Sequence, residues 1–114
     1  MISKDLLKGT IKTIVLKLLE ENGRMYGYEI TKEVERVTEG KLVISWGGLY
    51  PVLHKLVAEK IIISEEVSIG KRVRIYYTLT ESGSKFAREK VQEFKDFVSI
   101  VGSIIDPKPS LNLA

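Results

Sequence analysis

Residues 45–59 read SWGGLYPVLHKLVAE and predict a helix with two chemically different faces. Ser45 is a favourable N-cap for a helix over residues 46–59. At the helical spacing of about 100° per residue, one face is apolar and is expected to point into the core: Leu49, Val52, Leu53 and Leu56. The opposite face holds Tyr50, Pro51, His54, Lys55 and Ala58. Within this helix no carboxylate comes before Glu59.

The outward face of this helix is suited to DNA. An α-helix fits the major groove, where polar side chains read base edges and phosphates repel acidic side chains. We therefore predict that Tyr50, His54 and Lys55 contact DNA. The alternative for Tyr50 is a surface aromatic that shields an adjacent element, and the alternative for His54 is simple exposure.

Two glycines open the same helix. Gly47 and Gly48 let the backbone approach DNA closely, and a helix N-terminus favours a phosphate, so Gly48 is a predicted DNA-binding residue. The alternative is that both are loop residues that lead into the helix. We interpret Trp46 as a core or dimer contact, because tryptophan more often packs than reads bases.

Two further helices are predicted upstream. Residues 7–18 place apolar side chains at helical spacing opposite a row of lysines, and Asn22-Gly23 is a stop signal. Among those lysines, Lys8 and Lys12 are predicted to contact DNA, and the alternative is a solvated face. A shorter helix begins at Gly27 and ends near residues 38–40. Three helices with short connections fit a helix-turn-helix core.

A β-hairpin with a basic tip is predicted directly after the third helix, in the place of a wing. Residues 61–67 are β-prone, residues 68–71 form a turn, and residues 73–79 alternate like a returning strand. Lys71 and Arg72 at the tip, with Arg74 on the open face, are expected to contact phosphates or the minor groove. The alternative is that these cations protect edge strands from aggregation.

A long last helix, capped by Thr80, is predicted to make the protein a homodimer. Its apolar residues recur in a heptad-like seam: Ala87, Val91, Phe94, Val98, Val101 and Ile105. Phe86, Phe97 and Ile104 widen this stripe beyond what a small winged domain can cover. The alternative is a helix packed back on its own domain.

The expected fold class is mainly α with a small β-hairpin, a winged helix-turn-helix plus a C-terminal dimerisation helix. Residues 1–80 are expected to form the DNA-binding domain and residues 81–106 the dimerisation helix. Pro107 and Pro109 stop that helix, and we expect residues 107–114 to form a disordered tail.

Composition excludes several classes of function. The 114 residues contain no cysteine and one histidine, which leaves no thiolate metal site, no cysteine nucleophile and no imidazole zinc site. We expect no metal, no cofactor and no enzymatic activity. Lysines interrupt the N-terminal apolar run, so neither a signal peptide nor a membrane span is expected, and the expected compartment is the cytoplasm. The net charge of +3 is compatible with nucleic acid.

The alternative function is a winged helix used for protein–protein assembly without sequence-specific DNA binding. Such a module would normally show acidic or apolar residues on the outward face of helix 46–59, and this face lacks carboxylates. The leading prediction is therefore a sequence-specific regulator, acting as a repressor, on a pseudo-palindromic operator in double-stranded DNA.

Four stretches together resemble the PadR family of bacterial and archaeal transcriptional regulators. They are LKLL (residues 16–19), YGYEI (26–30), GLYPVLHKL (48–56) and YYTLTESG (76–83), in family order and spacing. The resemblance implies a homodimeric winged helix, usually a repressor released by a small phenolic or drug-like effector or by another cell-state signal. The single C-terminal helix resembles the smaller subfamily, in which the effector can lie between the subunits near these helices.

The resemblance also implies roles for individual residues. Tyr50, His54 and Lys55 match the recognition helix, and Lys71 with Arg72 match the basic tip of the wing. Tyr28 matches the tyrosine that opens the second helix, where a phosphate contact or packing is expected. The corresponding effector site would be lined by Phe94, Phe97 and Val98.

Three positions depart from the family pattern. Phe94 stands where many relatives have a tryptophan at the dimer interface, which removes the indole donor and puts planar-drug binding in doubt. Trp46 stands where relatives commonly have a proline or an acid. Gly48 stands where they have serine or threonine, so a hydroxyl contact to phosphate is missing. Operator affinity or sequence is therefore expected to differ.

Overall fold

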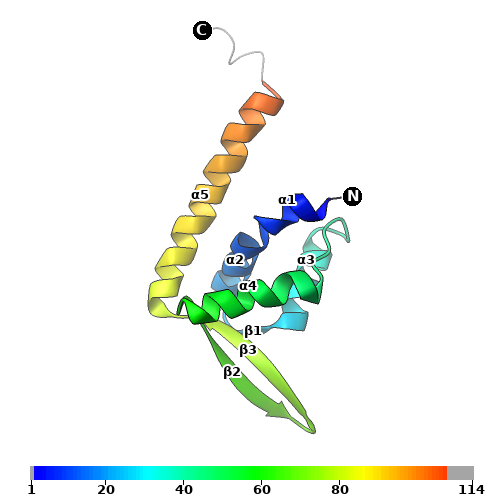
Figure 1. Ribbon diagram of the computed structural model, residues 1–114, viewed down its shortest axis with the longest axis vertical. Helices are drawn as coiled ribbons and strands as arrows, with labels where there is room; N and C mark the ends of the chain where they lie inside the picture. Colours follow the sequence, from blue (N-terminus) through cyan, green and yellow to red (C-terminus); the bar gives the residue numbers. More distant parts are fainter. Residues whose placement is uncertain (1, 108–114) are drawn as a thin grey trace.

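The computed structural model describes residues 2–107 as five helices and a small sheet (Figure 1). The helices are α1 (Lys4–Lys8), α2 (Ile11–Asn22), α3 (Gly27–Val37), α4 (Trp46–Ala58) and α5 (Glu81–Ile105). The strands are β1 (Met25–Tyr26), β2 (Ile62–Ile69) and β3 (Arg72–Leu79). The predicted fold class, mainly helical with a hairpin after the third core helix, is confirmed.

The first predicted helix is broken in two. Gly9 caps α1, its N–H bonds to the carbonyl of Leu7, and the Thr10 hydroxyl donates to the carbonyl of Leu6 at 3.0 Å. Glycine has a low helix propensity, and α2 starts afresh at Ile11 after Gly9 and Thr10. The apolar stripe of the predicted helix was correct along α2 only, since the structure buries no residue of α1.

Helices α2, α3 and α4 enclose the core. Its fully buried large side chains include Leu16, Leu19, Ile30, Leu49, Leu53 and Leu56. The predicted inner face of α4 is confirmed, with Val52 half-buried at its edge. Burying a leucine or isoleucine side chain contributes about 1.5–3 kcal/mol each, so this cluster holds the three helices in place.

Strands β2 and β3 form the hairpin. They pair antiparallel from Ile62↔Leu79 to Ile69↔Arg72, and Gly70 turns the chain with φ of 61°. The short strand β1 adds to the other edge of β3, with Met25 opposite Tyr77 and Tyr26 opposite Tyr76. Strand β1 was not predicted, because two residues are too few to show a period.

The start of α5 packs tightly on the chain. The predicted Thr80 cap is confirmed: its hydroxyl oxygen accepts from Gly83 N–H at 2.9 Å and donates to the carbonyl of Lys60 at 2.9 Å. Gly83 is buried so closely that a Cβ there would overlap the carbonyl oxygen of Ile61. This position therefore requires glycine.

The first two positions of the predicted dimer seam lie in the chain's own core. Ala87 and Val91 are 0% and 9% exposed because the first half of α5 packs on α2, and this leaves Ala87 no surface to offer a partner. Phe94 and Val101 are half-buried, whereas Val98 and Ile105 are 52% and 76% exposed. The seam belongs to the chain's own core over its first two positions and is uncovered toward its end.

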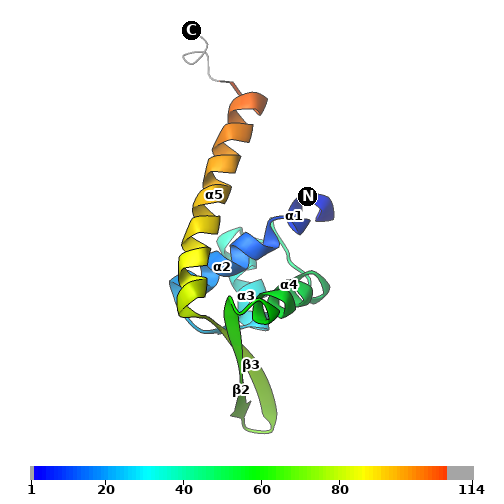
Figure 2. The same cartoon turned by 60° about the vertical axis from the view of Figure 1, so that its left-hand side comes forward.

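The molecule is elongated, with extents of 63 × 32 × 21 Å. Figures 1 and 2 show that α5 and the hairpin project from opposite ends of the helical core. No helix within residues 2–107 is both long and apolar enough to cross a membrane. Apart from Pro107, the tail predicted over residues 107–114 lies outside the described residues.

Candidate nucleic-acid interface

The outward face of α4 is exposed as predicted. Tyr50, Pro51, His54, Lys55 and Ala58 are all exposed, and no carboxylate lies between Trp46 and Ala58. The helix begins at a true cap, since the Ser45 hydroxyl accepts from the Gly48 N–H at 3.1 Å. The structure therefore presents a convex helix surface with phenol, imidazole and ammonium groups and no acid.

Trp46, which was interpreted as a core or dimer contact, extends this surface and is not a core residue. The side chain is 53% exposed, with its ring centroid 5.3 Å from that of Tyr50. Tyr50 in turn stacks on His54 at 5.9 Å. Positions 46, 50 and 54 are four apart and share one helix face, a signal that the sequence analysis could have used.

Gly48 does not fit the predicted phosphate contact. It is half-buried, and a Cβ there would lie in ordinary contact with the Ile11 side chain. Its N–H is already bonded to the Ser45 side chain. The neighbouring Gly47 is the exposed glycine of this turn.

The cations of the wing fall into two groups. Lys71 and Arg72 are exposed at the tip, as predicted. Arg74 was predicted to lie open on the same hairpin, but it is half-buried with its guanidinium carbon 4.4 Å from the ring centroid of Tyr26. Hydrogen bonding to Tyr76 raises the pKa of Arg74, so its charge is held between two tyrosines.

Arg24 and Arg74 fasten the hairpin to the start of α3. Arg24 lies 4.2 Å from the ring centroid of Tyr76 and bonds to Glu65 of β2 at 3.0 Å. Tyr26 meets Tyr76 edge-on at 5.3 Å. Each cation–π contact contributes about 0.5–1 kcal/mol at an exposed site, and both add to the β1–β3 pairing that joins the hairpin to the start of α3.

The remaining predicted contacts are spread over α1, α2 and α3. Tyr28, in the first turn of α3, is 62% exposed, with the Lys32 ammonium 5.3 Å from its ring centroid. Lys8 is exposed at the end of α1. Lys12 is half-buried, and its ammonium lies 5.2 Å from the ring centroid of Phe86, so its charge is directed at α5.

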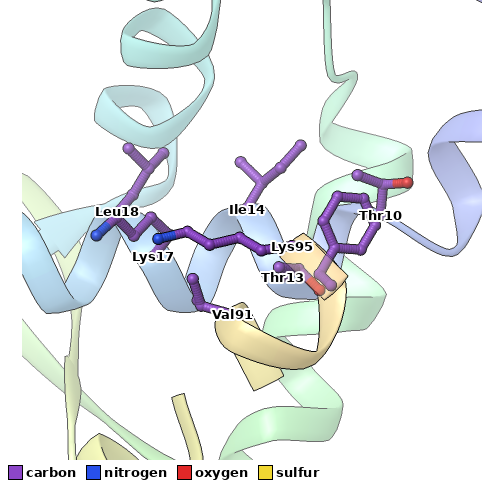
Figure 3. Close-up of a pocket in the computed structure, with 8 residues that line it drawn as sticks. Thr10, Thr13, Ile14, Lys17, Leu18, Val91 and Lys95 are labelled. Atoms are coloured by element: carbon purple, nitrogen blue, oxygen red, sulfur yellow. The ribbon is translucent and has the colours of Figure 1, made fainter. Parts of the chain in front are cut away.

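An apolar groove of about 270 Å³ runs between α2 and α5 (Figure 3). Its walls include Ile14 and Leu18 of α2 with Val91 and Phe94 of α5. Of the predicted effector residues, the groove contains Phe94, while Phe97 is 60% exposed farther along α5. Within residues 2–107, no cluster of three histidine, aspartate or glutamate side chains could hold a metal ion.

A helix-turn-helix core followed at once by a β-hairpin defines a winged helix protein. In helix-turn-helix proteins the second helix of the motif is the recognition helix, and α4 occupies that place here. The chain belongs to the PadR-like family of transcriptional regulators, because the model described as "Transcriptional regulator PadR-like family" matches residues 15–89. The resemblance noted in the sequence is thereby confirmed.

Solved structures and a relative agree with this family. A transcriptional regulator from Clostridium thermocellum is similar, with a TM-score of 0.80 and 31% identity, over 93% of this chain and all (100%) of that one. A PadR family regulator from Eggerthella lenta has a TM-score of 0.73 and 27% identity, over 91% and 88%. Transcriptional regulator YqjI of Escherichia coli is 28% identical over 93% of this chain and 52% of its own. The chain thus spans about half of YqjI.

Proposed function

We propose that this regulator binds specific DNA sequences by inserting α4 into the major groove. The observation that supports this most directly is the exposed face of α4, where Tyr50, His54 and Lys55 stand together without a carboxylate. These groups can hydrogen-bond to base edges or phosphates. In this proposal residues 1–80 form the DNA-binding part, with Tyr28 as a phosphate contact.

The wing contributes phosphate contacts through Lys71 and Arg72. Both cations are exposed at the hairpin tip, whereas Arg24 and Arg74 are engaged with tyrosines at its base. The basal pairs hold the hairpin at a fixed angle, so the two free cations meet the backbone beside the groove that α4 occupies. Phosphate contacts of this kind position the protein, and α4 reads the sequence.

The experiment is selection of DNA fragments by the purified protein, followed by affinity measurements on the selected duplex and on a random one. Tyr50→Ala and Lys55→Ala should each weaken binding to the selected duplex by about 1–3 kcal/mol more than binding to the random duplex. Lys71→Ala with Arg72→Ala should weaken both equally. The double variant should also flatten the salt dependence by about 0.9 for each phosphate that it no longer neutralises.

Lys85→Ala with Arg88→Ala is the matched control, since it removes the same charge from exposed positions on α5. An unchanged salt slope in the wing variant would show that Lys71 and Arg72 do not contact the phosphate backbone. Failure to enrich any DNA at low salt would overturn the proposal and favour the assembly module instead.

The second half of α5 supports a homodimer. Residues 97–105 contain no charged residue, and Phe97, Ile100 and Ile104 are 60%, 63% and 76% exposed. A helix that is apolar all round is normally buried by a neighbour. A second copy crossing near Phe94 would cover these residues in both subunits through one two-fold contact, and residues 81–106 would form the dimerisation element.

Such a dimer would place two copies of α4 on one side of the DNA, about 34 Å or a multiple of this apart, and would select a pseudo-palindrome. Sedimentation at micromolar concentration should give about twice the chain mass. A folded monomer under these conditions would overturn the dimer.

Regulation follows if the groove between α2 and α5 accepts a small aromatic effector. The groove has the apolar lining that such a ligand needs, and in a dimer Phe97 and Val98 of both subunits would close it. Suppose that the ligand favours a separation of the two α4 helices other than the one that DNA requires. The ligand must then weaken DNA binding by the same factor by which DNA weakens the binding of the ligand. The protein would then act as a repressor released by the effector.

A panel of planar aromatic and phenolic compounds tests this proposal by thermal shift and by release from the selected duplex. At least one compound should raise the melting temperature and also release the protein from the selected duplex. Phe94→Ala should weaken the binding of that compound. If no compound does either while Phe94→Ala only lowers the melting temperature, the groove is packing surface and regulation lies elsewhere.

A further inference from the structure

The single tryptophan of the chain, Trp46, lies at the edge of the proposed DNA surface. It is the first residue of α4, and 53% of the side chain is exposed. Tryptophan is mostly buried in proteins, so an exposed indole on a helix that points at a partner calls for a role. Its neighbour on the same face is Tyr50, at 5.3 Å between ring centroids.

The indole is fixed by the packing beneath it. A Cβ at Gly27 would overlap the six-membered ring of Trp46, so the ring lies directly on the backbone at the start of α3. Tyr50 borders it along α4. A ring held on two sides loses little rotamer freedom on binding, and this makes it a rigid contact for a partner.

We propose that Trp46 contacts DNA and helps to choose its sequence, through apolar contact with the C5-methyl group of a thymine in the major groove. The inference rests on the proposed function of α4. The N-terminal residues of a recognition helix are those that contact base edges. Thymine alone offers a methyl group there, and apolar side chains recognise it. Trp46 thus adds preference for an A·T pair to the polar contacts of Tyr50, His54 and Lys55.

Fluorescence gives the first test, because all indole emission comes from Trp46. The selected duplex should change that emission and should protect the indole from acrylamide quenching, at the same concentration at which a gel shift shows binding. Unchanged emission and quenching with the DNA fully bound would overturn the role of Trp46 and leave the DNA-binding function standing. Absence of DNA binding would overturn both.

Deoxyuridine substitution gives the second test, because it removes only the methyl group. Replacing the contacted thymine should lower the affinity of the wild-type protein for the duplex about fourfold, the equivalent of about 0.8 kcal/mol for one buried carbon. The Trp46→Ala protein should bind the thymine duplex more weakly than the wild type does. It should not distinguish thymine from uracil at that position. Trp46→Phe should keep part of the discrimination, since it keeps an aromatic ring over Gly27.

Val37→Ala is the control, since it truncates an apolar side chain that is 62% exposed at the far end of α3. It should retain the full difference between thymine and uracil. Melting temperatures of Trp46→Phe and the wild type separate a weakened DNA interaction from a weakened fold. At each thymine position, the ratio of the affinities for the thymine and uracil duplexes can be compared between the two proteins. If this ratio is the same in the wild type and in Trp46→Ala at every position, the methyl contact is excluded.

Discussion

The two halves of α5 have the same apolar spacing and opposite surroundings. In the first half, Ala87 and Val91 are buried against α2. In the second half, Val98 and Ile105 continue the same heptad-like seam and are 52% and 76% exposed. Figure 1 shows the helix leaving the core midway, with no other element beside its end.

A heptad-like seam therefore predicts that a helix face is buried, but it does not say whether the same chain or a second subunit buries it. A helix of the chain's own core and a helix of a second subunit present the same chemistry to an apolar stripe. Charges add the missing information: Lys85, Arg88, Glu89 and Lys90 surround the covered half, whereas residues 97–105 have none. The covered half needs a solvated outer face, and the uncovered half needs cover on several sides.

The largest effect is expected from a charge in the covered half. Ala87→Asp places a carboxylate at a position that is 0% exposed and should cost about 3–5 kcal/mol, much of the stability of a small domain. Urea unfolding would measure the loss. Arg88→Asp, at the exposed neighbouring residue, should change stability by less than about 0.5 kcal/mol. A stable Ala87→Asp protein would mean that α5 does not pack on α2 in solution.

The same change in the uncovered half should separate subunits and leave each one folded. Val98→Asp should raise the dimer dissociation constant about 30-fold or more, since a carboxylate would be buried in an apolar contact, about 2 kcal/mol or more. Sedimentation equilibrium measures this constant, and circular dichroism checks the fold. Ser99→Asp, one residue along, is the control and should have a smaller effect. Equal dissociation constants for Val98→Asp and wild type would contradict the proposed interface.

Glycine substitutions sharpen the comparison within one helix. Gly83→Ala should destabilise the protein by about 1–3 kcal/mol, because the added methyl group overlaps the Ile61 carbonyl and the helix start must move. Thermal unfolding at fixed protein concentration measures this loss. An unchanged melting temperature would show that the start of α5 can shift without cost.

The smallest effect, with the opposite sign, is expected at Gly102. A Cβ there meets nothing within 4 Å, so Gly102→Ala should stabilise the helix by about 0.5–1 kcal/mol through its better propensity. The same unfolding experiment measures the gain. A loss of stability instead would show that a partner helix approaches the backbone closely at this residue.

Local signals predicted most of the fold. The Ser45 and Thr80 caps, the inner face of α4 and the hairpin were each visible in short stretches, because capping and periodicity act between residues close in sequence. The break at Gly9 was missed because the apolar stripe continues across it. The strand β1 was missed because its pairing with β3 joins residues about fifty positions apart.

The candidate site was predictable in part for the same reason. Exposure of Tyr50, His54 and Lys55 follows from the helical period alone. Arg74 and Lys12 were expected to be free cations, and their attachment to Tyr26 and Phe86 depends on which elements meet. Trp46 was expected to be a core or dimer contact because tryptophan more often packs than reads bases, and its exposure depends on how α4 crosses the start of α3.

The amino-acid sequence alone was therefore sufficient for the family, the order of the main helices and the hairpin, and the chemistry of the outward face of α4. The elements and the outward face depend on residues within a turn or two of one another, and the family depends on four short stretches in their order along the chain. The tertiary structure was needed to divide α5 into a covered and an uncovered half and to separate anchored from free arginines. It also placed the indole of Trp46 against Tyr50 on the exposed surface of α4. Burial and cation–π contacts join residues that are distant along the chain, and only the packing of the helices and the sheet decides which of them meet.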